Sequence, residues 1–420
     1  MKVHSDSFEY RFLLVSLHID GILRETTIAG RTNMLSSMKN GVGLGGAYDA
    51  TLERVKAQDG EKTKLAMATL MWVCHSERPL QVDELCHALA VEIGSADFDP
   101  DNVPLMATLL GCCQGLITVD KEASTVRLIH YTLREYLSAY PDLSATAHST
   151  IAETCLTYLN AQQVRELPPY PPPDDQRMPF LNYSSQHWGI HAKKEFSDCT
   201  MSIALELLSG YEGHVSAISL LRQSRGGYDF GGSSLFSGLH CASFFGIVEL
   251  VTIFMGGEVG WTNQRNRTGA TPLLWAARNG HEEVVGLLLD QENVNPDSPN
   301  TNGRTPLQHA ARNGHENVVK LLLKQENVNI NSYDIKGITS LVYPATGGHD
   351  AVVKLLLERE DIIPDWQDNR GGTALWGAVA FGTEEIVKLL LEREDVDPNL
   401  SDNDGGTPLS GLPDLDGKPL

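Results

Sequence analysis

Two histidines stand at the i, i+4 spacing with which one helix face can hold a metal ion, in the segment His187-Trp-Gly-Ile-His191. A zinc hydrolase of this pattern needs a Glu beside the first His, where this chain has Trp188, and no third ligand is evident. The seven cysteines, at positions 74, 86, 112, 113, 155, 199 and 241, form no CxxC pair. We therefore predict no metal site, and the odd, scattered cysteines indicate reduced core thiols of a cytoplasmic or nuclear protein.

Phosphate chemistry requires a glycine-rich loop that ends in Lys-Ser/Thr, because the loop amides and the Lys hold the phosphates. The one candidate, Gly41-Val-Gly-Leu-Gly-Gly46, has no Lys-Ser/Thr after it. A serine-hydrolase elbow, a kinase motif set and a Cys beside a basic cluster are also missing. The sequence predicts no cofactor, no ATP binding by this chain and no enzyme; an enzyme with unfamiliar catalytic residues is the weakest alternative.

The formal net charge is −21, and the stretch from residue 271 onward holds 24 Asp and Glu against 12 Lys and Arg. Such a field repels nucleic acid and anionic membranes. No apolar run is long enough to span a bilayer, and the run Phe12 to Leu17 is too short for a signal-peptide core. We expect neither nucleic acid nor a membrane as a partner.

The strongest pattern is a block that returns every 34 residues. Its clearest copies are Thr271-Pro-Leu-Leu-Trp-Ala-Ala-Arg-Asn-Gly-His281 and Thr305-Pro-Leu-Gln-His-Ala-Ala-Arg-Asn-Gly-His315, each followed by Val-Val-x-Leu-Leu-Leu. Fainter copies begin at Thr339, Thr373 and Thr407. A fixed period of this length is typical of a solenoid, whose units bury their apolar faces against their neighbours.

Each copy contains the signals of two helices and a turn. Thr caps the first helix, Pro occupies its first position and Gly ends it, and the Val-Val-x-Leu-Leu-Leu stripe predicts the second helix. An Asn or Asp three residues before a Gly predicts a tight turn between copies. These pairs are Asn266–Gly269, Asn300–Gly303, Asp334–Gly337, Asp368–Gly371 and Asp402–Gly405.

This block resembles the ankyrin repeat over about residues 235–411, with a degenerate first unit at Ser237-Gly-Leu-His-Cys-Ala-Ser243. Two departures matter. Pro344 falls inside a first helix and predicts a shortened helix and a local weak point. After Thr407-Pro-Leu409 only eleven residues remain, so the last unit is expected to lack a second helix and the array looks cut.

The resemblance implies that a partner contacts the hairpin tips and first helices on the concave side of the array. Carried over by position, the tip residues are Arg267, Thr268, Thr301, Asn302, Ile335, Lys336, Asn369 and Arg370. The helix residues are Arg278, Asn279, Arg312, Asn313, Thr346, Ala380 and Phe381. The two Arg-Asn pairs could equally be solvated consensus residues. Trp275, His309 and Tyr343 share one position and are expected to pack.

Before the repeats, apolar spacing predicts helices over about 62–74, 82–92 and 105–111, then strands at 116–119 and 125–129. Three helices and a hairpin are the pattern of a winged helix. The stretch resembles the winged-helix region after the nucleotide-binding core of fungal NACHT-type signalling ATPases that carry ankyrin repeats. Its matching segments include Leu70-Met-Trp-Val73, Arg78-Pro-Leu-Gln-Val-Asp-Glu-Leu85, Gly115-Leu-Ile-Thr-Val119 and Arg127-Leu-Ile-His-Tyr-Thr132.

That resemblance implies a winged helix that packs on an ATPase core and does not read DNA. Its final His can touch a nucleotide phosphate in related ATPases; the matching residue is His130, for which a buried hydrogen-bonding role is favoured here. Residues 10–57 look like the last helices of the ATPase module. The stretch Pro168-Pro-Tyr-Pro-Pro-Pro173 predicts a rigid connector, with docking to an aromatic groove as the alternative.

The sequence therefore predicts a mainly α protein: a winged-helix and helical N-terminal region followed by an ankyrin α-solenoid with short β-hairpin turns. The predicted parts are 1–59 (ATPase-module helices), 60–140 (winged helix), 141–231 (helical connector), 232–411 (about five repeats) and 412–420 (tail). The leading hypothesis is a non-catalytic protein that binds a protein partner through the concave face of about 235–411, while residues 60–195 either dock to a NACHT-type ATPase module or act as a spacer. The alternative is a fragment of a NACHT/STAND ATPase, an innate-immunity-like switch whose P-loop core lies outside this chain.

Overall fold

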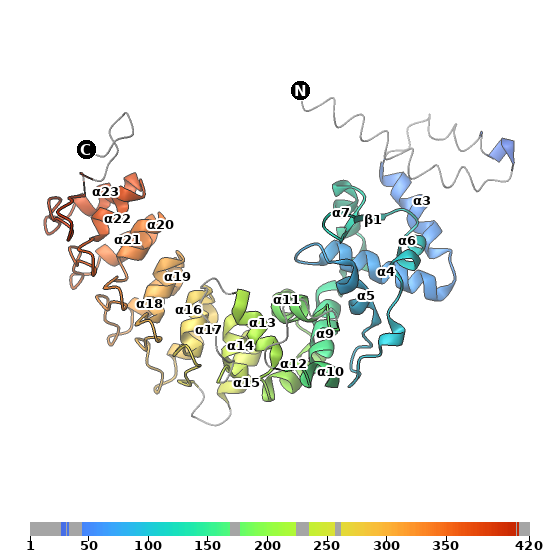
Figure 1. Cartoon of the computed structure of the whole chain (residues 1–420), viewed down its shortest axis with the longest axis horizontal. Helices are drawn as coiled ribbons and strands as arrows, with labels where there is room; N and C mark the ends of the chain where they lie inside the picture. Colours follow the sequence, from blue (N-terminus) through green and yellow to red (C-terminus); the bar gives the residue numbers. More distant parts are fainter. Residues whose placement is uncertain are drawn as a thin grey trace. The chain divides into compact units, whose positions relative to one another are not determined.

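The computed structural model describes residues 27–30, 32, 44–168, 177–223, 235–256, 262–408 and 410 (Figure 1). The described chain is mainly helical and divides into two compact units, an N-terminal unit, Met1–Ile203, and a C-terminal unit, Ala204–Leu420. The predicted fold class, a mainly α chain with a winged-helix region and a helical solenoid, is confirmed. The two strands of the N-terminal unit form a small sheet within it.

The N-terminal unit contains the predicted order of helices and hairpin. Helices α3 (Leu44–Lys56), α4 (Gly60–His75), α5 (Val82–Ala90), η1 (Pro100–Asn102) and α6 (Met106–Cys112) precede strands β1 (Ile117–Asp120) and β2 (Thr125–Leu128). The strands are antiparallel, with Ile117 opposite Leu128 and Asp120 opposite Thr125. Strand β2 packs on α4 and α5, so the hairpin covers the helices as a wing does.

The rest of this unit is helical. It consists of α7 (Tyr131–Ser138), α8 (Pro141–Ser144), α9 (Ala147–Asn160), α10 (Gln162–Arg165) and α11 (Leu181–Lys194), and α12 (Asp198–Ser209) crosses into the C-terminal unit. Helices α9 and α11 pack along each other, and α4 packs on α9. The ring of Trp72 lies 5.6 Å from Phe180 and 6.0 Å from Tyr183, which joins α4 to α11 in one aromatic core. The proline stretch after residue 168 lies outside the described residues.

The C-terminal unit is a stack of helix pairs. Helix α13 (Val215–Gln223) is followed by the pairs α14 (Gly238–Phe245) and α15 (Val248–Met255), α16 (Pro272–Arg278) and α17 (Glu282–Leu289), α18 (Pro306–Arg312) and α19 (Glu316–Leu323), α20 (Val342–Gly347) and α21 (Asp350–Leu357), and α22 (Ala374–Ala380) and α23 (Glu384–Leu391). Each first helix packs on the next first helix, and each second helix on the next second helix (Figure 1).

Small residues allow the first helices to approach one another closely. Ala276, Ala277, Ala310 and Ala311 are fully buried between successive helix pairs. The second helices contribute larger side chains, and the buried ones repeat with the period of the sequence: Val284, Val285 and Leu288, then Val318, Val319 and Leu322, then Val352, Val353 and Leu356. The core is therefore a continuous strip that no single repeat could bury alone.

Pro344 shortens its helix, as predicted, by moving the start of the helix. The helix α20 has six residues, whereas α16, α18 and α22 have seven, and it begins at Val342, two positions later than the repeat period would place it. Pro344 consequently stands at the third position of α20, within the first turn, where an N–H has no intrahelical partner in any case. The predicted incomplete last unit falls largely on residues 409 and 411–420, which lie outside the described residues; positions 407, 408 and 410 are not helical.

Candidate functional site

The first helices of the array begin with the predicted caps. The hydroxyl oxygens of Thr271, Thr305 and Thr373 accept hydrogen bonds from backbone N–H groups three residues later, at 3.3, 3.3 and 3.2 Å. Pro272 and Pro306 occupy the first position of their helices. These caps fix the start of α16, α18 and α22 at the same position of the repeat, so the residues at the far ends of these helices form a regular series.

A Gly and a His join successive repeats at three junctions, and Thr383 takes the place of the His at the fourth. Gly280 ends α16 with φ of +75°, and the ring of His315, from the following repeat, lies against it. A Cβ placed on Gly280 would lie 2.6 Å from Nδ1 of His315. On its other side the ring hydrogen-bonds through Nε2 to the carbonyl oxygen of Arg278 at 3.0 Å. His281 and His349 make the equivalent contacts to Phe244 and Arg312 at 2.8 and 3.1 Å.

Asn279 and Asn313 belong to the same inter-repeat junction. The amide of Asn279 donates to the carbonyl oxygen of Phe244 at 2.8 Å, and that of Asn313 donates to the carbonyl oxygen of Arg278 at 2.6 Å. These two predicted partner-binding residues therefore hold neighbouring repeats together, and they are not merely solvated consensus residues. Their occurrence in both copies within an unchanged Asn-Gly-His triplet was the signal for this role.

The hairpin tips are aligned by backbone hydrogen bonds from one repeat to the next. Each predicted turn closes with an N–H of Gly bonded to the carbonyl of the Asn or Asp three residues earlier, at 2.8 to 3.0 Å. Between repeats, the N–H groups of Thr301, Ile335, Asn369 and Asn403 donate to the carbonyls of Thr268, Asn302, Lys336 and Arg370 at 2.8 to 3.0 Å. This ladder presents successive tip side chains side by side.

The predicted contact residues differ in exposure. Ten of them are exposed, namely Arg267, Thr301, Arg312, Asn313, Ile335, Lys336, Asn369, Arg370, Ala380 and Phe381. Five are half-buried, namely Thr268, Arg278, Asn279, Asn302 and Thr346. Ile335 and Phe381 are large apolar side chains that remain 64% and 69% exposed. We call the surface formed by these tip and helix residues the first-helix face. Trp275, His309 and Tyr343 are buried as predicted.

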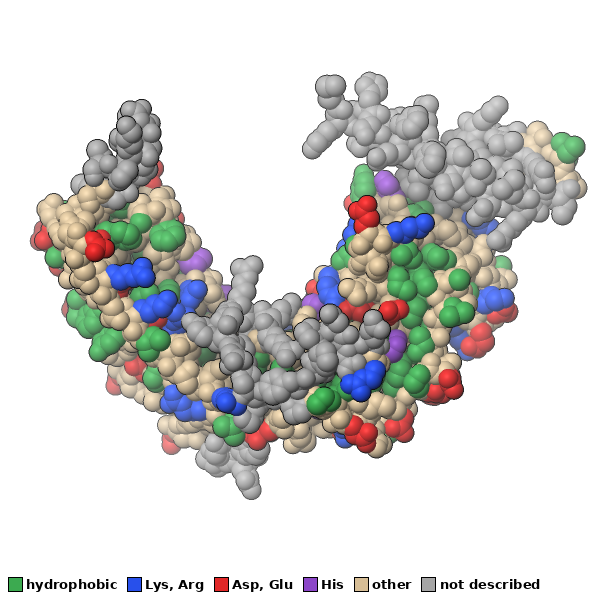
Figure 2. Space-filling model, in the orientation of Figure 1, with side chains coloured by type: hydrophobic (Ala, Val, Ile, Leu, Met, Phe, Trp, Pro, Cys, Tyr) green, Lys and Arg blue, Asp and Glu red, His purple; other side chains and the backbone are tan. Residues whose placement is uncertain are grey.

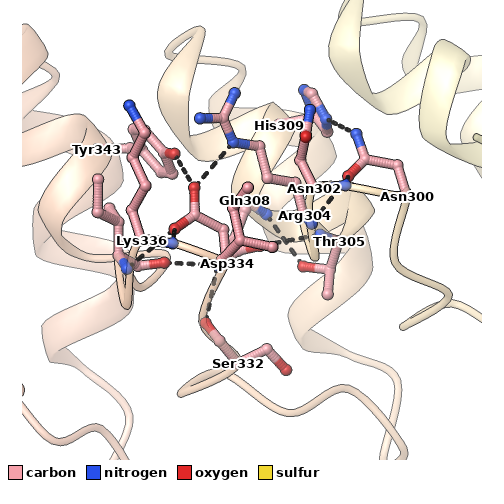
Figure 3. A network of polar contacts seen from close by, with 12 residues as sticks. Asn300, Asn302, Arg304, Thr305, Gln308, His309, Ser332, Asp334, Lys336 and Tyr343 are labelled. Carbon is pink, nitrogen blue, oxygen red and sulfur yellow. Dashed lines mark hydrogen bonds and ion pairs between the residues drawn. The ribbon is translucent and has the colours of Figure 1, made fainter. Parts of the chain in front are cut away.

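A buried polar network lies beneath the first-helix face, and the sequence did not single it out as a site (Figure 3). The carboxylate of Asp334 accepts hydrogen bonds from Nε of Arg304 at 3.0 Å, from the hydroxyl of Tyr343 at 2.6 Å, and from the N–H groups of Lys336 and Ile338 at 2.9 and 3.1 Å. Burial opposes ionisation of Asp334, but these hydrogen bonds outweigh it and lower the pKa of its carboxyl group.

Three arginines gather around this network, and we call Arg278, Arg304 and Arg312 the arginine cluster. The guanidinium of Arg278 lies over the ring of Trp275 at 5.2 Å, and those of Arg304 and Arg312 lie over the ring of Tyr343 at 5.1 and 5.2 Å. Lys and Arg side chains are grouped on this part of the array in Figure 2. Arg304 was not among the predicted contact residues, because its position precedes the capping Thr of the helix.

In the N-terminal unit, the segment that suggested the winged helix has a structural role. The guanidinium of Arg78 binds the carboxylate of Glu84 through two hydrogen bonds of 2.7 and 2.6 Å. Glu84 also accepts from the N–H of Gln81 at 2.9 Å and so caps helix α5. Arg78 in turn lies over the ring of Tyr183 on α11, 5.2 Å from its centroid. This segment therefore anchors α5 to α11.

His130 makes the hydrogen bonds favoured for it, as the N-cap of helix α7. Its Nδ1 lies 2.8 Å from the hydroxyl of Thr132 and accepts from the N–H of Thr132 at 3.3 Å. The side chain is half-buried and not buried as expected, because it stands at the exposed beginning of α7, beside the 66% exposed Tyr131.

His187 and His191 lie on one helix, α11, where His187 is half-buried and His191 is in the core. His191 is buried, with Nε2 3.0 Å from the hydroxyl of Tyr183 and Nδ1 2.8 Å from Nδ1 of His148. Burial lowers the pKa of His191 to about 3 and that of His187 to about 4, so both rings are neutral near pH 7. Among the described residues, no three His, Cys, Asp or Glu side chains are grouped so as to hold a metal ion.

The two units match two different protein families. The family described as ankyrin repeats, in three copies, matches residues 239–334 and 326–402. Residues 239–402 of this chain are ankyrin repeats. Its ankyrin array includes the degenerate unit, whose first helix α14 is capped by Ser237 and packs on α16. Ankyrin repeats are non-catalytic modules that bind protein partners.

The family described as the winged helix domain of GPI inositol-deacylase matches residues 52–149. The architecture of the protein is thus an N-terminal winged helix of this type, the one found after the nucleotide-binding core in fungal NACHT proteins, followed by ankyrin repeats. No curated protein matches the chain. No helix in the described ranges has both the length and the apolar character needed to cross a membrane.

Proposed function

We propose that this protein is a non-catalytic interaction protein that binds a protein partner through its first-helix face. The proposal rests on the difference between the positions of the repeat that build its framework and the positions that are exposed. Turn residues and buried aliphatic side chains recur from repeat to repeat, and Thr caps the first helix in three of the repeats. The exposed tip position, in contrast, is occupied in turn by Arg267, Thr301, Ile335 and Asn369. A fixed framework with chemically varied exposed positions suits the recognition of one specific surface.

Two exposed apolar residues are the expected anchors of that contact. Ile335 lies at a hairpin tip, and its equivalents in other repeats are polar. Phe381 lies at the end of α22; its equivalents are Asn279, Asn313 and Gly347, and in the degenerate unit the buried Phe245. Large apolar side chains surrounded by polar residues resemble the central contacts of protein interfaces, which carry most of the binding free energy. The surrounding Asn369 and Arg370 would supply the polar rim.

The proposal is tested by affinity capture with the full chain from cells that express it. Ile335→Ala with Phe381→Ala is expected to reduce the bound partner at least tenfold, because each anchor contributes about 1–2 kcal/mol. Leu391→Ala, which removes a 49% exposed side chain from the second helix α23, is the matched control and should leave the partner bound. If both variants retain the same partners, the first-helix face is not the binding surface.

The free cysteines favour a reducing compartment. All seven are free thiols, and six of them are buried. Burial raises the pKa of Cys86 to about 11 and that of Cys113 to about 12, which keeps them protonated and unreactive. We propose on these grounds that the protein resides in the cytoplasm or the nucleus. Labelling of the six buried thiols in the native protein would be slow, and rapid labelling would contradict their burial.

A second function is favoured by the winged-helix match at residues 52–149. In this case the N-terminal unit packs on a NACHT-type ATPase module, in the same or another polypeptide, which switches state with its bound nucleotide. The ankyrin array binds the protein partner that triggers this switch. An in-frame P-loop upstream of the codon for Met1 would support this function. Calorimetric titration of the purified chain with ATP should show no binding, and binding would overturn the inference that this chain has no ATPase activity of its own.

A further inference from the structure

The arginine cluster is an exception within an acidic array. From residue 271 onward the chain has twice as many acidic as basic residues, yet Arg278, Arg304 and Arg312 lie close enough to repel one another, and Arg304 is bonded to the carboxylate of Asp334. Lys336 is exposed at the adjoining hairpin tip and adds a fourth positive charge. The carboxylate of Asp334 is buried and accepts hydrogen bonds from Arg304, Tyr343 and two backbone N–H groups. Its single negative charge neutralises the three guanidiniums only in part.

The rings beneath the cluster hold its guanidiniums in place. Trp275 supports Arg278, and Tyr343 supports both Arg304 and Arg312. A guanidinium that rests on an aromatic ring can still present the N–H fork that binds a carboxylate through two hydrogen bonds. Because side chains that are already ordered lose less entropy on binding, the cluster is better prepared for an anion than a set of free surface lysines is.

Burial and the positive charge of the cluster lower the pKa values of Arg278 and His309. Burial lowers the pKa of Arg278, and the charges of Arg312 and Arg304 lower it further. Burial, followed by the charges of the same three arginines, lowers the pKa of His309 to about 3. A carboxylate brought against the cluster would relieve this mutual repulsion.

The size of the cluster determines which anion fits. Charges further away than about 8–10 Å are screened at physiological salt, so the cluster attracts an anion at contact although the array as a whole is acidic. A nucleic acid or a membrane extends far beyond the cluster and would meet the surrounding Asp and Glu residues. A short acidic segment of a protein would not.

We propose that the arginine cluster, together with Lys336, binds a short Asp- and Glu-rich segment of the protein partner. The inference rests on the proposed function, of which it specifies the partner. The carboxylates pair with Arg278 and Arg312 from the open side, while Arg304 stays bonded to Asp334. Ile335, next to Lys336 in the chain, lies at the edge of the same site, so an apolar side chain beside the acidic segment completes the contact.

The direct test is fluorescence anisotropy of the full chain with a fluorescein-labelled peptide of alternating Glu and Gly. Arg312→Gln and Arg278→Gln are each expected to weaken binding roughly tenfold, the effect of losing one charge-assisted pair of hydrogen bonds. Lys354→Gln removes the same charge from an exposed position on the second helix α21 and should change the affinity less than twofold. Affinity should also fall as salt is raised.

Equal affinities of the arginine variants and the Lys354→Gln control would overturn the inference, and so would tighter binding of a thymidine oligonucleotide than of the peptide. Circular dichroism of Arg312→Gln, whose side chain is exposed, confirms that the variant is folded. If a partner captured through Ile335 and Phe381 keeps its affinity for the double arginine variant, the acidic-segment inference fails and the proposed function stands. Loss of that partner together with the peptide supports both.

Discussion

Two glycines six positions apart are expected to respond oppositely to the same substitution. Gly280 ends α16 with φ of +75°, and an added Cβ would lie 2.6 Å from Nδ1 of His315. Gly286 lies inside α17, and an added Cβ there would have no atom within 4 Å. Ala is a better helix former than Gly, so Gly286→Ala should stabilise the array by about 1 kcal/mol.

For Gly280→Ala two costs add. A residue with a Cβ in the left-handed region costs about 1–2 kcal/mol, and overpacking against a ring held by its neighbours costs about 1–3 kcal/mol. The sum is a loss of roughly 2–5 kcal/mol. The ring of His315 cannot move away without breaking its 3.0 Å hydrogen bond to the carbonyl oxygen of Arg278.

The assay is urea denaturation combined with hydrogen exchange of peptides from 272–323, which reports the local free energy of opening in this part of the array. A double-mutant cycle with His315→Ala separates the two costs, since removing the ring should relieve the overpacking and leave only the backbone cost. If Gly280→Ala costs the same in the presence and the absence of the His315 ring, the packing explanation is wrong. If Gly286→Ala also destabilises the array, the reasoning about open space is wrong.

Two further predictions concern buried side chains, and a third concerns the helix that contains Pro344. The pKa of His309 is about 3 in the folded protein and about 6.5 in the unfolded chain, so the unfolded chain binds more protons between these values. The free energy of unfolding should therefore fall by roughly 1.4 kcal/mol per pH unit below about pH 6.5. His309→Gln should reduce that slope in urea titrations from pH 7 to pH 5, and an unchanged slope would refute the assignment. Asp334→Ala should destabilise the array by about 3–5 kcal/mol, because it leaves the guanidinium of Arg304 without its carboxylate, whereas Asp334→Asn keeps the turn acceptor, as Asn300 does one repeat earlier, and should cost less; equal midpoints in thermal unfolding would contradict this order. Amides in 339–349 should exchange faster than those in 305–315, and Pro344→Ala should slow them; uniformly high protection in both segments would show that no weak point exists.

Much of the local structure of the array could be predicted because its signals lie within one repeat. The capping Thr, the Pro at the first helical position and the Asn or Asp before the turn Gly act over three or four residues, and the structure confirms them. The helix and strand order of the winged helix followed in the same way from apolar spacing. The boundaries proposed for the domains and the partner-binding role of the first-helix face remain predictions.

The sequence by itself determined the repeat, the two-helix unit, the turns and the absence of recognisable catalytic motifs, since all of these depend on neighbours along the chain. Only the tertiary structure decided which polar residues act together. Asn313 binds a carbonyl 35 residues away, and Arg304 pairs with Asp334 30 residues away. Arg304 and Arg312, from one repeat, share the ring of Tyr343 from the next. Such contacts form between repeats, and their geometry depends on how one repeat stacks on the next. Stacking between repeats also fixes the position of α20. Within that position the helix begins at Val342, later than in the other repeats, so that Pro344 lies in its first turn.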